Sequence, residues 1–129
     1  MEPCVFCDFV NNGWGSVIFE NGQCVCIECA DEVLPGSCII IPRAHRETVF
    51  DLTADEWRAT QDLLDKAKRY IGKKYRPDGY NVGWNVGETG GQEVFHAHMH
   101  VIPRHSDEPL AGKGIRYWIK QKSNTRPRE

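Results

Sequence analysis

One alternating run constrains this chain more than any other feature. Between Val94 and Ile102, histidine recurs at every second position as His96, His98 and His100, and the residues between are apolar. A period of two is typical of a strand, because successive side chains of a strand point to opposite faces. We therefore predict a strand over residues 94–102 with the imidazoles on one face. The other face has a core composition: Phe95, Ala97, Met99 and Val101.

The spacing limits what these histidines can do together. Alternate residues of a strand lie about 6.7 Å apart, so His96 and His100 would be about 13 Å apart. Zinc–nitrogen bonds of about 2.0–2.1 Å let one ion bind two neighbouring imidazoles, but not all three. A neutral imidazole can instead attack phosphorus and form a covalent intermediate. Residues 87–91, rich in glycine, suit anion binding by backbone N–H groups. A zinc-binding strand and a chance surface pattern are the alternatives.

The segment His96-Ala97-His98-Met99-His100-Val101-Ile102 matches the pattern His-x-His-x-His followed by two apolar residues. In this it resembles the histidine triad (HIT) family of nucleotide hydrolases and transferases, and residues 91–96 and 101–104 resemble the bacterial branch. The resemblance covers about residues 4–104. It implies an α+β, HIT-like domain with a mainly antiparallel sheet, one long helix and a shorter one, and it implies a homodimer.

The resemblance also implies an activity. The enzyme would act at the α-phosphate of nucleotide conjugates, phosphoramidates or dinucleoside polyphosphates, by hydrolysis or nucleotidyl transfer. His98 would form a nucleotidyl-histidine, His100 would stabilise charge, and His96 would orient its neighbours or bind zinc. The nucleotide- and phosphate-binding candidates are Asn85, Gly91, Gln92, Glu93, Val94, His98 and His100. A non-catalytic nucleotide-binding or zinc-containing interaction protein is the alternative, although pure binding needs no nucleophile.

The chain opens with a Cys-x-x-Cys motif, Cys4 to Cys7. A redox motif would follow a buried strand, and the three residues before Cys4 leave no room for one. The motif is therefore either half of a zinc site or a pair of small buried hydrophobic residues. Some members of the family hold zinc with such a pair, a histidine after a Pro-x-x-His segment and the first triad histidine. The resemblance thus implies a structural zinc ion on Cys4, Cys7, His45 and His96. For His45, an ordinary loop histidine is the alternative.

Further elements follow from local signals. Asn21-Gly22 between two apolar runs predicts a hairpin of residues 17–20 and 24–27, with Cys24 and Cys26 in the core. The aliphatic run 38–41 predicts a buried strand that Pro42 ends. A capping box, Thr53 with Glu56, predicts a helix to about Lys73. Residues 80–85 alternate again and predict a strand that pairs with the triad strand and has three core residues: Tyr80, Val82 and Trp84.

Length and charge set the remaining expectations. A chain of 129 residues is one domain, which we divide into the HIT domain, residues 1–110, and an extension, 111–129, whose end from Ser123 we expect to be disordered. A net charge of −2 gives no basic field for nucleic acid or a membrane surface, and no apolar run could span a bilayer. Without a recognisable signal peptide, the six cysteines indicate reduced thiols or metal ligands and a cytoplasmic protein.

Two positions depart from the family pattern. Cys29 stands where many members carry the aspartate that binds ribose, and Glu28 and Asp31 lie beside it. Glu93 stands where some branches have serine or threonine near the leaving group. We therefore expect the phosphate to be recognised more strongly than the base, and no preference for one leaving group carries over.

Overall fold

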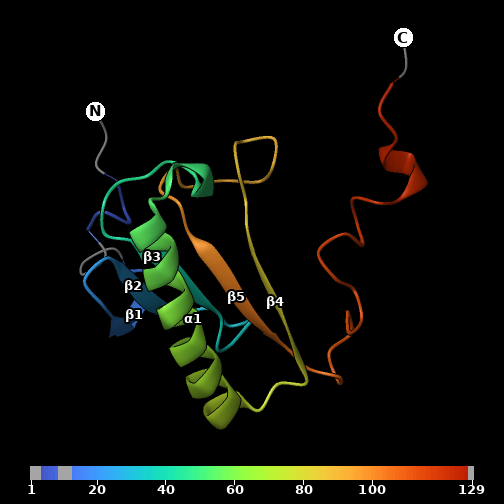
Figure 1. Ribbon diagram of the computed structural model, residues 1–129. Coiled ribbons are helices and arrows are strands. Elements are labelled where there is room, and N and C mark those ends of the chain that lie inside the picture. The colour runs from blue at the N-terminus through green and yellow to red at the C-terminus, as the bar shows by residue number, and fades with distance from the viewer. Residues whose placement is uncertain (1–3, 9–12, 128–129) are drawn as a thin grey trace.

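The structure is a computed structural model that describes residues 4–8 and 13–127. Five strands form one sheet in the order β1-β2-β3-β5-β4, with all neighbours antiparallel. One long helix, α1, lies across one face of the sheet (Figure 1). The elements are β1 (Gly15–Glu20), β2 (Cys24–Cys29), β3 (Cys38–Pro42), the 3-10 turn η1 (Val49–Asp51), α1 (Ala54–Tyr75), β4 (Gly79–Trp84), β5 (Met99–Arg104) and the 3-10 turn η2 (Lys122–Asn124). The expected α+β fold is confirmed, and among the described residues the shorter helical element takes the form of 3-10 turns.

Local chemistry accounts for the first two connections. The β1–β2 hairpin turns at Asn21-Gly22, as predicted. The side-chain oxygen of Asn21 accepts hydrogen bonds from the N–H groups of Gln23 (3.1 Å) and Cys24 (2.8 Å) and so fixes the turn. Strand β3 ends at Pro42, which has no N–H to continue a ladder.

Helix α1 starts at the predicted capping box and ends at Tyr75. The Glu56 carboxylate accepts a hydrogen bond from the Thr53 N–H (2.8 Å) and another from the Arg46 guanidinium (3.1 Å), and Glu56 is 1% exposed. Burial alone would raise the pKa of Glu56, but these bonds hold it below its usual range. The carbonyl oxygen of Arg46 accepts from the N–H of Ala97 (2.6 Å). The start of the helix is thereby tied to the triad segment.

Both faces of the sheet carry apolar side chains. The first cluster lies between the sheet and α1 and consists of Cys24, Cys26, Cys38, Ile40, Leu63, Ala67, Ile71, Met99 and Val101. The second cluster consists of Phe6, Val25, Ile27, Ile39 and Ile41. Cys24 and Cys26 lie in the core, as predicted, whereas Phe6 brings the N-terminal segment into the second cluster.

The strand that carries the triad is shorter than the alternating pattern predicts. β5 begins at Met99, so His96 and His98 precede it and only His100 lies within it. Met99 is also the first residue of β5 that pairs with β3 or with β4. β4 ends at this level, and β3, although it continues to Pro42, pairs with β5 only as far as Ile40. Before Met99, the N–H of Ala97 bonds instead to the carbonyl oxygen of Arg46. The prediction of a strand over residues 94–98 is therefore wrong.

Alternation also misplaces two apolar side chains. Phe95, assigned to the core, is 46% exposed, because it lies in the irregular segment before β5. Val82 is 39% exposed, because β4 is an edge strand. Tyr80 and Trp84 of the same strand are partly buried against the core under α1.

After β5 the chain continues as an arm of turns, residues 105–127, which stands away from the sheet (Figure 1). The Arg104 guanidinium holds its start by donating to the carbonyl oxygen of Lys113 (2.8 Å). The predicted disorder of residues 123–129 remains a prediction, and residues 128–129 lie outside the described part. In that part, no helix has both the length and the apolar character needed to cross a membrane.

Candidate functional site

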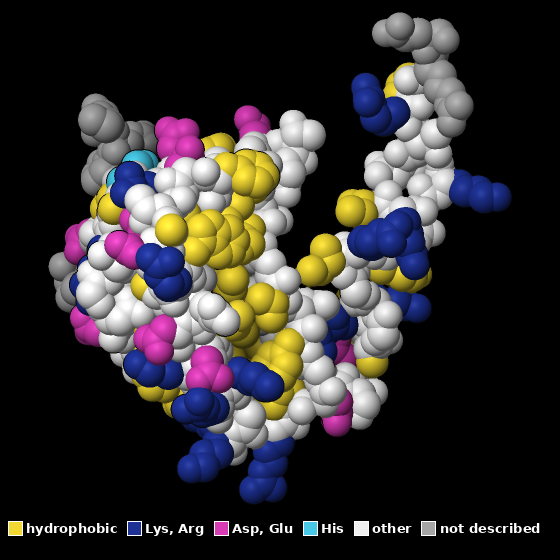
Figure 2. Space-filling model, in the orientation of Figure 1, with side chains coloured by type: hydrophobic (Ala, Val, Ile, Leu, Met, Phe, Trp, Pro, Cys, Tyr) yellow, Lys and Arg dark blue, Asp and Glu magenta, His cyan; other side chains and the backbone are white. Residues whose placement is uncertain are grey.

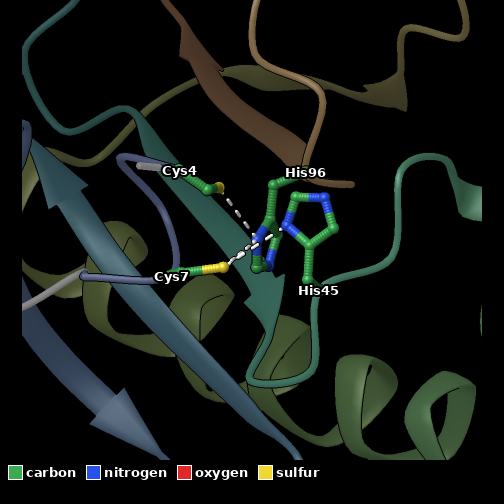
Figure 3. A group of neighbouring side chains, drawn as sticks. All are labelled: Cys4, Cys7, His45 and His96. Atoms are coloured by element: carbon green, nitrogen blue, oxygen red, sulfur yellow. Dashed lines mark hydrogen bonds between the residues drawn. The ribbon is translucent and has the colours of Figure 1, made fainter. Parts of the chain in front are cut away.

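Four side chains from three separate segments meet beside the start of β5 (Figure 3). Cys4 and Cys7 come from the N-terminal segment, His45 follows β3, and His96 precedes β5. Their ligand atoms all lie within 4.8 Å of one another, the one such group in residues 4–8 and 13–127. His96 Nδ1 lies 3.4 Å from Cys4 Sγ and 3.5 Å from Cys7 Sγ, and His45 Nδ1 lies 3.3 Å from Cys7 Sγ. The four predicted metal ligands thus form a cluster that could hold a metal ion.

The spacing of the cluster fits a tetrahedral ion. With zinc–sulfur bonds of about 2.3 Å and zinc–nitrogen bonds of about 2.0–2.1 Å, tetrahedral ligands lie about 3.5 Å apart. His96 Nδ1 faces two sulfurs at once, which one lone pair or one proton cannot satisfy well by hydrogen bonding. His96 Nε2 lies 2.7 Å from the carbonyl oxygen of Pro42, so Nε2 carries the proton and Nδ1 keeps its lone pair. A metal-bound histidine usually makes such a second bond.

The protonation states of the cluster are also relevant to metal binding. Burial, followed by the adjacent Cys4 thiol, raises the pKa of Cys7, which disfavours two thiolates side by side. A bound divalent ion would lower the pKa of both thiols, because metal-bound thiols are deprotonated. Burial lowers the pKa of His96 and keeps its imidazole neutral, the form that binds metals.

His98 presents a neutral imidazole with one free nitrogen. His98 is only 8% exposed, and its Nδ1 lies 2.8 Å from the carbonyl oxygen of His96. Because a carbonyl oxygen only accepts, Nδ1 carries the proton and Nε2 carries the lone pair. Among the described residues Nε2 has no hydrogen-bond partner. Burial lowers the pKa of His98, so at neutral pH the ring is in its nucleophilic form.

His100 lies directly beside the candidate nucleophile. The ring centroids of His98 and His100 are 4.8 Å apart. Burial, and next the neighbouring His98, lowers the pKa of His100, and its Nε2 is buried without a partner in the described part of the chain. A buried polar atom of this kind is expected to find its partner in a ligand. His100 and Asn85 line one cavity of about 260 Å³.

Asn85 and Gly91 are also neighbours. A Cβ built on Gly91 would lie 3.7 Å from the side-chain amide carbon of Asn85, and Gly91 has a φ of +94°, which disfavours any larger residue. Asn85 therefore lies against the glycine loop that follows it, and it lines the same cavity as His100, 15 positions further along the chain.

Gln92 fixes the loop through its side chain. Its Oε1 accepts from the N–H of Gly87 (2.9 Å), and its Nε2 donates to the carbonyl oxygens of Glu47 (2.6 Å) and Val94 (3.0 Å). Both amide hydrogens are thus used within the protein, and Gln92 is better described as a positioning residue than as a donor to phosphate. The backbone N–H groups of Glu93 and Val94 have no partner among the described residues and remain for an anion.

Phe6 is a neighbour of the triad that the sequence analysis did not identify. It lies between the two cysteines of the motif and is fully buried. Its ring centroid lies 5.0 Å from that of His98 and 6.2 Å from that of His96, both in edge-on contact. The segment that carries Cys4 and Cys7 therefore also places an aromatic ring against the candidate nucleophile. The sequence signal that could have pointed to Phe6 is its position, as an aromatic residue inside the Cys-x-x-Cys motif.

Comparison with known proteins places this site in a family. The Bacillus subtilis protein Hit is 32% identical over 105 residues, 81% of this chain and 72% of that protein. Adenylylsulfatase HINT3 from Arabidopsis thaliana is 29% identical over 104 residues, 80% of this chain and 53% of that protein. A solved structure of a Zn-bound histidine triad family protein from Mycobacterium smegmatis is similar with a TM-score of 0.72 and 26% identity, covering 84% of this chain and 80% of that one. The family model of the HIT domain matches residues 13–107, more than half of the sequence, and the chain therefore belongs to the HIT domain family.

Proposed function

We propose that the protein is a HIT-type hydrolase or nucleotidyltransferase that acts at the α-phosphate of nucleotide phosphoramidates or dinucleoside polyphosphates. The observation that carries this proposal is the state of His98: a buried, neutral imidazole whose Nε2 lone pair has no partner among the described residues. A protein that only binds a nucleotide gains nothing from such a group, whereas nucleophilic catalysis requires it.

The reaction takes place in two steps. His98 Nε2 forms a bond to the α-phosphorus while the bond to the leaving group breaks, and the leaving group departs with the electron pair and takes up a proton. Water or another acceptor then displaces His98 and releases the nucleotide. His100 Nε2 and the N–H groups of Glu93 and Val94 stabilise the charge on the phosphoryl oxygens, and Asn85 contacts phosphate or ribose. His96 orients His98 through its carbonyl oxygen.

The relatives support a nucleotide substrate. One carries the name adenylylsulfatase, and a similar structure from Sulfolobus tokodaii, 25% identical with a TM-score of 0.73, is described as a hypothetical histidine triad nucleotide-binding protein. The aspartate expected for ribose binding is absent here, and burial raises the pKa of Cys29, which takes its place, to about 11, so this thiol is neutral. Recognition of the phosphate by the loop before His96 then contributes more than recognition of the sugar or base.

A structural zinc ion is part of this proposal. Cys4, Cys7, His45 and His96 supply four protein ligands, which leaves no open coordination position for catalysis. The zinc would fix the N-terminal segment to the start of β5. Six free cysteines fit a reducing compartment, and we place the protein in the cytoplasm.

Turnover by the purified protein tests the proposed activity. An adenosine 5′-phosphoramidate and a dinucleoside polyphosphate are each incubated with the protein, and release of the mononucleotide is followed. Release of AMP from either substrate, abolished by denaturing the protein first, supports the enzyme. Binding of AMP without turnover of either compound would favour the non-catalytic alternative.

We also propose that the protein is a homodimer. β4 is an edge strand, and an apolar cavity of about 290 Å³ between α1 and β4 includes Leu64, Tyr80 and Val82. Hydrophobic side chains gather on this face and across a hollow from it on the arm (Figure 2). Ile115 and Trp118 of the arm are 64% and 63% exposed. A second copy would cover both the free edge and these apolar groups.

Substitution of one edge residue tests the dimer. Val82→Lys would place a charge of the same sign on both copies, and we expect the dimer dissociation constant to rise at least a hundredfold, about 2.7 kcal/mol. Val33→Lys is the matched control, because Val33 is 86% exposed in the loop between β2 and β3 and should leave the dimer intact. Sedimentation equilibrium measures both. A monomeric parent protein at micromolar concentration, or a Val82→Lys variant that dimerises as the parent does, would contradict the proposal.

A further inference from the structure

A buried ion pair lies at the start of α1. Glu56 is 1% exposed, and both oxygens of its carboxylate accept from the Nε–H group of Arg46, at 3.1 and 3.2 Å. The carboxylate also accepts from the N–H of Thr53, which completes the capping box. Capping needs only the bond to Thr53, so it accounts neither for the burial of the carboxylate nor for its pairing with Arg46.

Stability does not explain this pair either. Moving two charges out of water costs free energy that their attraction often fails to recover, and apolar residues of similar size often replace a buried pair without loss of stability. Arg46 itself lies in the irregular segment between β3 and η1. Within the described part of the chain, residues 44–47 form one backbone–backbone hydrogen bond. The ion pair therefore helps to fix a segment that neither a strand nor a helix holds.

That one backbone hydrogen bond reaches the triad. The carbonyl oxygen of Arg46 accepts from the N–H of Ala97 at 2.6 Å. The carbonyl oxygen of His96, which accepts from Nδ1 of His98 at 2.8 Å, belongs to the same peptide group as that N–H. Because a peptide group is planar and rigid, its direction at the Arg46 end also sets its direction at the His98 end. Arg46 and the His98 ring thus bind one peptide group from its two sides.

His98 and His100 differ in what else fixes their backbone. His100 lies in β5 and pairs with Ile39 of β3 and Gly83 of β4, so ladders hold it on both sides. His98 precedes β5 and has no ladder partner among the described residues. Loosening of Arg46 should therefore displace the nucleophile and leave His100 in place.

We propose that Arg46 and Glu56 are positioning residues that set the direction of the His98 ring through the peptide group between His96 and Ala97. The inference rests on the proposed function and adds to it two residues that act on His98 and not on the substrate. Attack on phosphorus requires the Nε2 lone pair to point at the reacting atom, and a displacement of about 1 Å can lower the rate about a hundredfold. The pair thus contributes to kcat and not to nucleotide binding.

Glu56→Gln tests the pair without removing the helix cap. Glutamine also completes a capping box, but its amide N–H group would face the Nε–H group of Arg46, donor against donor. We expect kcat for an adenosine 5′-phosphoramidate to fall about tenfold, with KM within about threefold of the parent value. Arg46→Met should give the same fall. The double variant should also lose about tenfold and not a hundredfold, because both changes break one link.

Two controls on the same helix separate positioning from general effects. Asp65→Asn breaks the exposed ion pair with Arg69, and Ile71→Ala removes buried core packing near the far end of α1. We expect kcat of both to stay within about threefold of the parent value, although Ile71→Ala should lower the melting temperature at least as much as Glu56→Gln does. A kcat that falls as far in Ile71→Ala as in Glu56→Gln, or an effect of Glu56→Gln on KM alone, would overturn the proposal.

NMR spectroscopy provides a readout that does not depend on turnover. In Glu56→Gln the amide proton of Ala97 should shift upfield as its short hydrogen bond lengthens, and the ring signals of His98 should move with it, whereas those of His100 stay. Unchanged Ala97 and His98 signals would overturn the positioning role whatever happens to kcat. If the parent protein turns over no nucleotide conjugate, the proposed function fails, and these signals alone then decide whether the pair sets the His98 ring.

Discussion

Replacement of His98 by alanine is expected to abolish turnover, with kcat reduced at least about 10⁴-fold, while nucleotide affinity stays within about tenfold. The variant removes the candidate nucleophile, the Nε2 lone pair of the buried His98 ring, and the phosphate donors of the loop remain. Single-turnover kinetics and calorimetric titration with AMP measure the two effects separately.

The control is His105→Ala, which removes an imidazole three residues beyond Ile102, the end of the alternating run, and outside the cavity lined by Asn85 and His100. We expect its kcat/KM to stay within about threefold of the parent value. Equal melting temperatures and metal contents would show that both variants are folded. Substantial turnover by a folded His98→Ala protein would remove His98 from the role of nucleophile.

The second large effect is expected from loss of the metal. The protein purified without chelator should contain one zinc per chain, and Cys4→Ser should contain none. Without the ion, the two thiols and His96 lose their common partner, and the free energy of unfolding should fall by about 3 kcal/mol or more. Elemental analysis and denaturant unfolding measure these changes.

Activity should fall with the metal, because Phe6 sits between the two cysteines and contacts His98. Cys26→Ser is the matched control: it alters a buried core thiol, so it should cost about 1 kcal/mol of stability but keep the zinc. If the parent protein contains no zinc and Cys4→Ser does not change its stability, the two cysteines are packing residues and not metal ligands. A bound metal with water as its fourth ligand would instead indicate a catalytic ion.

Local chemistry explains which features the sequence predicted. The Asn21-Gly22 hairpin, the strand end at Pro42 and the helix start at Thr53 each depend on residues next to one another in the chain. The cluster of four candidate metal ligands was predicted from the family resemblance, although its members come from three distant segments.

The errors occur where structure depends on distant partners. β5 starts at Met99 because its pairing with β3 and β4 starts there and the N–H of Ala97 bonds to the carbonyl oxygen of Arg46 instead, and the alternation of residues 94–98 does not record these distant partners. The same is true of Gln92, whose side chain is held by the carbonyl oxygen of Glu47, 45 positions away in sequence. The contact of Phe6 with His98 joins two segments more than 90 positions apart, so no local pattern in the sequence records it.

Detection of the covalent intermediate tests the central claim most directly. The protein is mixed with an adenosine phosphoramidate, quenched in base within one turnover, since phosphohistidine bonds survive there, and examined by intact mass and peptide mapping. We predict one adenylyl group per chain, attached to His98 and absent from the His98→Ala protein. Turnover without any adduct, or an adduct on His100 or another residue, would contradict the account.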